Sequence, residues 1–167
     1  MNAPLIVTAL FGGEDFAFLD ALRGRYYPAA HNVVPAHCSM ISHLSPAVAA
    51  ELKQRLNAET RGIPSPSARL SGVMDLNDGV ALRIDSPGLE AIRDRLAEAF
   101  APLLTPHDRA GWAPHVTLQN NVPRSTALAT KAQLEAGFHP RPLRIAGIAS
   151  WWYRGGPWEP HSRHMFA

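Results

Sequence analysis

The chain has few of the features that stabilise small secreted proteins or anchor proteins in membranes. Cys38 is the only cysteine among 167 residues, so no disulfide can form within the chain, and a reducing compartment is expected. No apolar run approaches the roughly 20 residues that a membrane-spanning helix needs. The apolar run LIVTAL (5–10) follows no basic residues and precedes acidic ones, which predicts a strand rather than a signal peptide. We therefore expect a cytoplasmic protein with no membrane partner.

Charge is also scarce. The net charge is +2 and charged residues make up 18% of the chain, so no global basic field indicates nucleic acid. Only Lys53 and Lys131 are lysines among the 16 basic residues. Arginine is the better bidentate partner for phosphate, but its excess also follows from genome composition. Hydrophobic residues make up 46%, which predicts a globular fold of one domain or of two lobes sharing a core.

Hydrophobic periodicity and turn residues divide the chain into alternating strands and helices. Strands are predicted at 5–10, 34–44, 68–76, 80–85, 111–121 and 141–153, with a weaker last strand after Gly155 and Gly156. Helices are predicted at 14–27, after Ser45-Pro46, after Ser86-Pro87 and from Ser125 to Gly137, each serine acting as an N-cap. The turn Asn77–Gly79 predicts a hairpin.

The two halves of the chain show the same order of strand, helix, strand with histidine, helix and strand. Corresponding features lie roughly 75 to 80 residues apart, which indicates an internal duplication. The matched pairs are Leu5 and Val80, His37 and His115, Ser45 and Ser125, and Leu70 and Ile145. We expect a single bilobal domain over 1–167, built from approximate repeats 1–77 and 78–167 that face each other.

Each half carries a histidine followed two residues later by a hydroxyl. The segment PHVTL (114–118) places His115 and Thr117 on one face of a strand, because successive side chains alternate between faces. The segment AHCSM (36–40) places His37 and Ser39 in the same way. The apolar residues between them are expected in the core. One such motif is usual at a half-exposed strand surface, whereas two at equivalent positions indicate a shared site.

The pair of imidazoles suits phosphodiester chemistry. Side chains with a pKa near about 6.5 can divide the roles of general base and general acid at neutral pH. Hydroxyl groups can donate hydrogen bonds to the non-bridging phosphate oxygens as charge gathers there. Such a site requires no metal and no cofactor. The sequence does not assign which histidine is the base.

Two such motifs on a duplicated α+β chain resemble the 2H phosphoesterase superfamily, which includes bacterial 2'-5' RNA ligase-like proteins and cyclic phosphodiesterases. PHVTL matches the family motif fully, whereas AHCSM carries Ser39 and Met40 where Thr and Leu are usual. The tail WWYRGGPWE (151–159) is similar to the end of bacterial members. The resemblance implies two antiparallel sheets facing a central cleft, with helices outside.

The resemblance also implies a function. It predicts a monomeric, metal-independent phosphodiesterase that hydrolyses a 2',3'-cyclic phosphate on an RNA end or nucleotide to a 2'-phosphate. The catalytic residues would be His37 and His115, and the phosphate would be bound by Ser39 and Thr117. RNA ligation with a 2'-5' bond would use the same residues in reverse. The alternative is a protein of the same fold that binds RNA ends or nucleotides without turnover.

Several other residues are candidates for substrate contact. Trp112, Trp151 and Tyr153 offer stacking surfaces for a base, although packing in the core is the other interpretation for each aromatic residue. Tyr27 and Arg154 are candidates for contact with the phosphate or sugar.

Metal binding is the competing interpretation for a chain with eight histidines. Zinc hydrolases usually place ligands as H-x-x-x-H on one helix, a pattern that this sequence lacks. The segment HSRH (161–164) has no cysteine nearby and no carboxylate to complete a site. We therefore predict no metal site.

Overall fold

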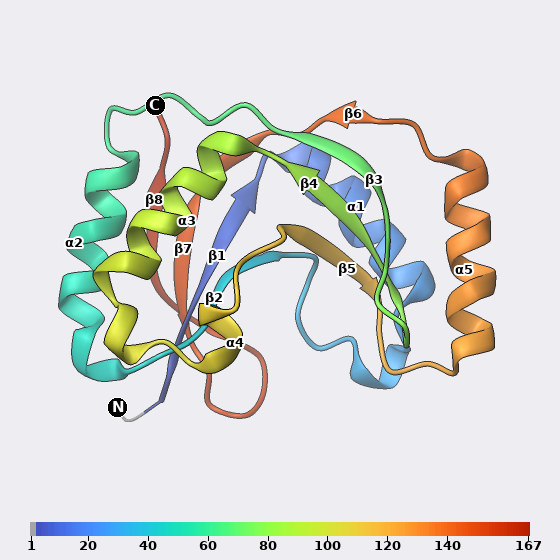
Figure 1. The fold of residues 1–167 in the computed structure, drawn as a ribbon, viewed down its shortest axis with the longest axis horizontal. Helices are drawn as coiled ribbons and strands as arrows, with labels where there is room; N and C mark the ends of the chain where they lie inside the picture. The colour runs from blue at the N-terminus through green and yellow to red at the C-terminus, as the bar shows by residue number, and fades with distance from the viewer. Residues whose placement is uncertain (1–2) are drawn as a thin grey trace.

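The structure is a computed structural model that describes residues 3–167. Within these residues the fold is α+β, with two four-stranded antiparallel sheets (Figure 1). Sheet A has the order β2-β1-β7-β8 and sheet B the order β5-β4-β3-β6. The strands of sheet A are β1 (Leu5–Phe11), β2 (Cys38–Leu44), β7 (Ile145–Trp152) and β8 (Glu159–Met165). Those of sheet B are β3 (Arg69–Asp75), β4 (Val80–Asp85), β5 (His115–Gln119) and β6 (Arg141–Pro142).

Helices flank both sheets. They are α1 (Gly13–Tyr26), α2 (Ala49–Thr60), α3 (Pro87–Ala99), the short α4 (Pro106–Arg109) and α5 (Arg124–Gly137). Helix α2 packs on β7 and β8, while α5 packs on β3 and β4. Helix α1 packs on β5 of sheet B, although it connects two strands of sheet A. Helix α3 lies beside α2 and sheet A, although it connects two strands of sheet B (Figure 1).

The two halves of the chain are therefore interlaced. Strand β3 belongs to the first half but pairs with β4 in sheet B, and β7 belongs to the second half but pairs with β1 in sheet A. The order of elements repeats as predicted, but the first half contributes β3 to sheet B and the second half contributes β7 and β8 to sheet A. A duplication of 1–77 and 78–167 remains our interpretation of this order.

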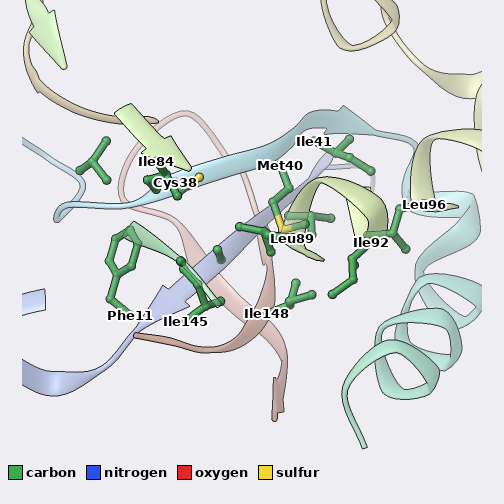
Figure 2. Close-up of a cluster of buried hydrophobic side chains, with 14 of the residues drawn as sticks. Phe11, Cys38, Met40, Ile41, Ile84, Leu89, Ile92, Leu96, Ile145 and Ile148 are labelled. Atoms are coloured by element: carbon green, nitrogen blue, oxygen red, sulfur yellow. The ribbon is translucent and has the colours of Figure 1, made fainter. Parts of the chain in front are cut away.

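One hydrophobic core joins the two sheets. Leu5 and Val7 of sheet A belong to the same cluster of buried side chains as Leu82 and Ile84 of sheet B. Figure 2 shows Met40 of β2 beside Leu89 of α3 within this cluster. Burial of large aliphatic side chains stabilises each by about 1.5 to 3 kcal/mol, so this shared core fixes the sheets against each other.

The predicted caps agree with the structure in part. The Ser86 hydroxyl accepts a hydrogen bond from the Leu89 N–H at 3.3 Å, and Pro87 opens α3 as predicted. Ser45 caps a short 3-10 turn (Pro46–Val48), which leads into α2. The prediction for Ser125 is wrong, because α5 begins one residue earlier after Pro123 and has no side-chain cap. Proline's fixed φ favours such a start without a capping hydroxyl.

Three predicted strands also need correction. The strand predicted at 141–153 is broken, because β6 pairs in sheet B and β7 in sheet A, and the chain crosses between the sheets at residues 143 and 144. The strands predicted at 34–44 and 111–121 begin only at Cys38 and His115. Proline lies shortly before each start, at Pro35 and Pro114, where it has no N–H to give to a sheet.

No helix in residues 3–167 combines the length and the apolar character needed to cross a lipid bilayer.

Candidate active site

The two histidine motifs lie next to each other, on strands of different sheets. His37 directly precedes β2 and His115 opens β5, and these two strands are in contact. The Cys38 thiol also lies against the backbone of His115. The residues that alternate with the motif positions are fully buried, among them Val116 and Leu118. The motif side chains themselves are half-buried, which leaves them accessible to a ligand.

Each imidazole makes an equivalent hydrogen bond to the backbone two residues before it. Nδ1 of His37 lies 2.8 Å from the carbonyl oxygen of Pro35, and Nδ1 of His115 lies 2.7 Å from that of Ala113. A carbonyl oxygen can only accept, so Nδ1 is the protonated nitrogen in each ring. In the neutral form Nε2 then carries the free lone pair. Each ring therefore has a fixed orientation and one nitrogen available to exchange protons.

The charge state of His37 is set by its surroundings. The pKa of His37 is lowered to about 4, mainly by burial. The hydrogen bond to Pro35 opposes this shift, while Arg23 and His115 act in the same direction as burial. The His37 ring is therefore neutral at pH 7 in the free protein. A bound phosphate anion would act in the opposite direction, because a negative charge favours the protonated imidazole.

Two buried arginines fix the strands that carry the motifs. Arg23 of α1 donates from its Nη1 atom to the carbonyl oxygen of Thr117 at 2.9 Å. Arg93 of α3 donates from Nε to the carbonyl oxygen of Met40 at 3.0 Å. Both side chains are only 4% exposed. Each helix therefore links to the motif strand of the sheet on which it packs, which makes both arginines positioning residues.

Neither arginine was predicted from the sequence, although the sequence contains a signal for both. Arg23 follows the buried Leu19 by four residues, and Arg93 follows the buried Leu89 by four. Residues four apart share one face of a helix, so each arginine lies on the face that packs inward. A charged side chain on such a face needs a buried partner.

Asp108 of α4 fixes the far end of β2. Its carboxylate accepts hydrogen bonds from the Ser42 N–H at 3.1 Å, the Ser42 hydroxyl at 3.0 Å and the His43 N–H at 3.3 Å. Its backbone carbonyl accepts a 2.6 Å hydrogen bond from Arg93. Asp108, which the sequence reasoning also missed, thus joins α3, α4 and the motif strand into one buried polar network.

The remaining predicted contact residues lie in three different environments. Trp151 lines a cavity beside His37. Trp112 and Tyr27 make contacts within the protein: the Trp112 indole N–H donates to the Ser39 carbonyl oxygen at 2.9 Å, and the Arg23 guanidinium lies 4.0 Å from the centre of the Tyr27 ring. Tyr153 and Arg154 are exposed, and Arg154 forms an ion pair with Glu159.

Within residues 3–167 no group of three or more His, Cys, Asp or Glu side chains is placed to hold a metal ion. His161 and His164 lie on β8. They form hydrogen bonds with Ser150 and Ser162 respectively, and His164 also contacts Asn57.

Cys38 is expected to be unreactive in the folded protein. Burial raises the pKa of its thiol to about 12, against the opposing contact with the His115 backbone, and the side chain has no exposed surface. Only the thiolate attacks disulfide reagents. Mixing with Ellman's reagent at pH 8 should release less than one tenth of the colour that the urea-unfolded protein releases in the same time. Equal rates in the two states would show that Cys38 is accessible.

Comparison with known proteins adds to this geometry. The sequence model of the 2'-5' RNA ligase superfamily matches residues 12–157. Escherichia coli LigT complexed with 3'-AMP is similar in structure, with a TM-score of 0.63 at 16% identity over 100% of this chain and 99% of LigT. LigT complexed with NADP+ has a TM-score of 0.61 at 16% identity over 99% of each chain. A Thermus thermophilus protein has a TM-score of 0.63 at 15% identity over 98% of this chain and 97% of that protein.

A comparison with curated protein sequences found no match. At these low identities the solved structures establish the fold, and they agree with the predicted 2H phosphoesterase-like architecture. The family match extends over most of the chain and includes both histidine motifs. The chain therefore belongs to the 2'-5' RNA ligase superfamily.

Proposed function

We propose that the protein is a metal-independent phosphodiesterase that opens a 2',3'-cyclic phosphate on a nucleotide or RNA end to a 2'-phosphate. The observation that carries this proposal is the matched pair of imidazoles, each with Nδ1 bound to the carbonyl two residues before it. Both rings thus keep Nε2 for proton transfer, and they lie on two strands in contact. Hydrolysis of a phosphodiester needs two such groups.

The reaction divides between the two rings. The neutral Nε2 of one histidine takes a proton from water as the water oxygen attacks phosphorus. The bond between phosphorus and the 3' oxygen breaks, and the protonated Nε2 of the other histidine gives its proton to that oxygen. The products are a 2'-phosphate and a free 3' hydroxyl. Ser39 and Thr117 donate hydrogen bonds to the non-bridging oxygens, where negative charge increases in the transition state.

Nucleotide binding by a protein of the same fold supports the choice of substrate. LigT has been crystallised with 3'-AMP, ATP and NADP+, each of which carries adenosine and phosphate. We extend this preference for nucleotides to the present chain. Ligation to form a 2'-5' bond would use the same two proton transfers in the opposite direction.

The test is hydrolysis of 2',3'-cyclic AMP by the purified protein in the presence of EDTA. We expect turnover that EDTA leaves unchanged, and chromatography against both standards should identify adenosine 2'-phosphate rather than the 3' isomer. Loss of activity in EDTA, with recovery on addition of a divalent metal, would contradict the proposed mechanism. Tight binding of adenosine 2'-phosphate without turnover of any cyclic phosphate would favour the non-catalytic binding protein instead.

A further inference from the structure

A cavity with a volume of about 300 Å³ opens directly beside His37. This volume lies at the lower end of the range for small-molecule sites. The wall comes from the end of β1, the start of α1, the segment before β2 and the β7–β8 connection. Its members include Thr8, Phe11, Phe16, Val34, Trp151 and Trp158. His115 is not among the lining residues, so the cavity extends from the His37 side of the motif pair.

Aromatic rings form the wall nearest to His37. The Trp158 ring meets the His37 ring edge to face, with 4.7 Å between centroids and 64° between planes. The Trp151 and Trp158 rings are 6.4 Å apart and tilted by 48°. Planar aromatic ligands bind well to such rings, because stacking removes apolar surface from water and matches the charge distribution of the rings.

The cavity offers few polar side-chain groups to a ligand. The Thr8 hydroxyl is fully buried and accepts a 2.9 Å hydrogen bond from the Trp151 indole N–H, so these two groups bind each other. The Trp158 indole N–H and the His37 imidazole are the other polar side-chain groups of the wall. A single indole donor can bond to an acceptor on any of the four bases, so it does not distinguish among them.

The lining residues include no charged carboxylate, lysine or arginine. A phosphate or a free ribose with several hydroxyls would therefore lose more hydration in this cavity than the Trp158 N–H and the His37 imidazole can replace. A nucleobase has two apolar faces and loses little by entering. The position beside His37 places such a base next to the proposed reaction centre.

Building on the proposed function, we propose that this cavity binds the nucleobase of the substrate by stacking on Trp158 and Trp151. The enzyme then accepts 2',3'-cyclic nucleotides with little preference among the four bases. Cyclic phosphates on a sugar without a base are poor substrates, because the aromatic wall has nothing to bind.

The experiment compares the wild type with Trp158→Ala on five substrates. These are the four 2',3'-cyclic nucleotides and 1-O-methylribose 2',3'-cyclic phosphate, which has no base. The wild type should use the four nucleotides within about tenfold of one another in kcat/KM, since stacking is tolerant of sequence. Trp158→Ala should lower kcat/KM for the nucleotides about tenfold or more, mainly through KM. Its loss on the methylriboside should be much smaller than its loss on the nucleotides, and a circular dichroism spectrum that matches the wild type would show that the variant is folded.

Two further variants sharpen the comparison. Phe16→Ala removes another aromatic ring that lines the cavity and should also lower activity on nucleotides. Phe18→Ala is the matched control, because Phe18 lies on the same helix, is exposed and contacts Arg141 outside the cavity. Equal kcat/KM of the wild type for nucleotides and methylriboside would overturn the proposal, and so would an equal loss on both in Trp158→Ala.

Binding measurements separate this proposal from the proposed function. If the wild type turns over none of the five substrates, the proposed function fails. Calorimetric titration with adenosine 2'-phosphate then tests the cavity on its own. Binding about tenfold weaker in Trp158→Ala than in the wild type would support the base site, and equal binding in the two proteins would overturn it.

Discussion

Replacing His37 or His115 by asparagine is expected to lower kcat for 2',3'-cyclic AMP by about 10³-fold or more, since general acid-base groups each contribute roughly 10² to 10⁴. The asparagine amide N–H can still donate to the carbonyl of Pro35 or Ala113, as Nδ1 does now. The local fold is therefore kept, while the Nε2 atom is lost. Initial rates at saturating substrate would measure the effect.

His43→Asn is the matched control for these variants. His43 lies near the far end of β2, the strand that His37 directly precedes, and its side chain is exposed. We expect kcat to stay within about twofold of the wild type, as is usual for surface substitutions. Unchanged activity in His37→Asn or His115→Asn would remove the histidine pair as the basis of the reaction.

A substrate with a good leaving group would assign the two roles. The p-nitrophenolate of a p-nitrophenyl phosphodiester leaves without a proton, so the general acid matters little for its release. The variant that lacks the acid should therefore recover most of its activity on this substrate, whereas the variant that lacks the base should not. Equal losses in both variants on both substrates would indicate that the histidines bind phosphate rather than transfer protons.

Asp108→Ala is expected to lower the free energy of unfolding by about 2 kcal/mol, the usual cost of removing a carboxylate that accepts several hydrogen bonds. The change leaves the N–H groups of Ser42 and His43 without the carboxylate that now binds them. The Thr105 hydroxyl, which also contacts the carboxylate, loses that partner as well. Urea unfolding followed by circular dichroism would measure the difference.

Asp94→Ala serves as the comparison for this prediction. Asp94 lies on α3 and is exposed, so its loss should change stability by less than about 0.5 kcal/mol. A cost for Asp108→Ala as small as that for Asp94→Ala would show that water replaces the carboxylate without penalty. We also expect Asp108→Ala to lower activity, because the network holds the strand that follows His37.

The sequence predicted the parts of the site that depend on local geometry. Strand alternation alone placed Val116 and Leu118 in the core and His115 and Thr117 on the accessible face, and burial follows this pattern. The cap of α3, Ser86 followed by Pro87, could also be predicted, because capping involves only residues that are close in the sequence. The features that could be predicted therefore depend on residues only a few positions apart in the chain.

The rest depends on contacts between distant residues. Arg23 bonds to a carbonyl 94 residues away and Arg93 to one 53 residues away, and no local pattern identifies such partners. The apolar pattern of 141–153 predicted one strand, but it cannot tell to which sheet each part belongs. The sequence offered Trp158 as one of several aromatic residues that could stack on a base, but its contact with His37 arises from tertiary structure and could not be predicted.

Because the two halves are interlaced, the two sheets should unfold together. Neither sheet can lose its structure while the other survives, since each holds a strand from the opposite half and both share one core. Local opening of one lobe would expose this core, so its free energy approaches that of complete denaturation. Fluorescence of the tryptophans, far-ultraviolet signal and catalytic activity should consequently disappear together in a single cooperative transition.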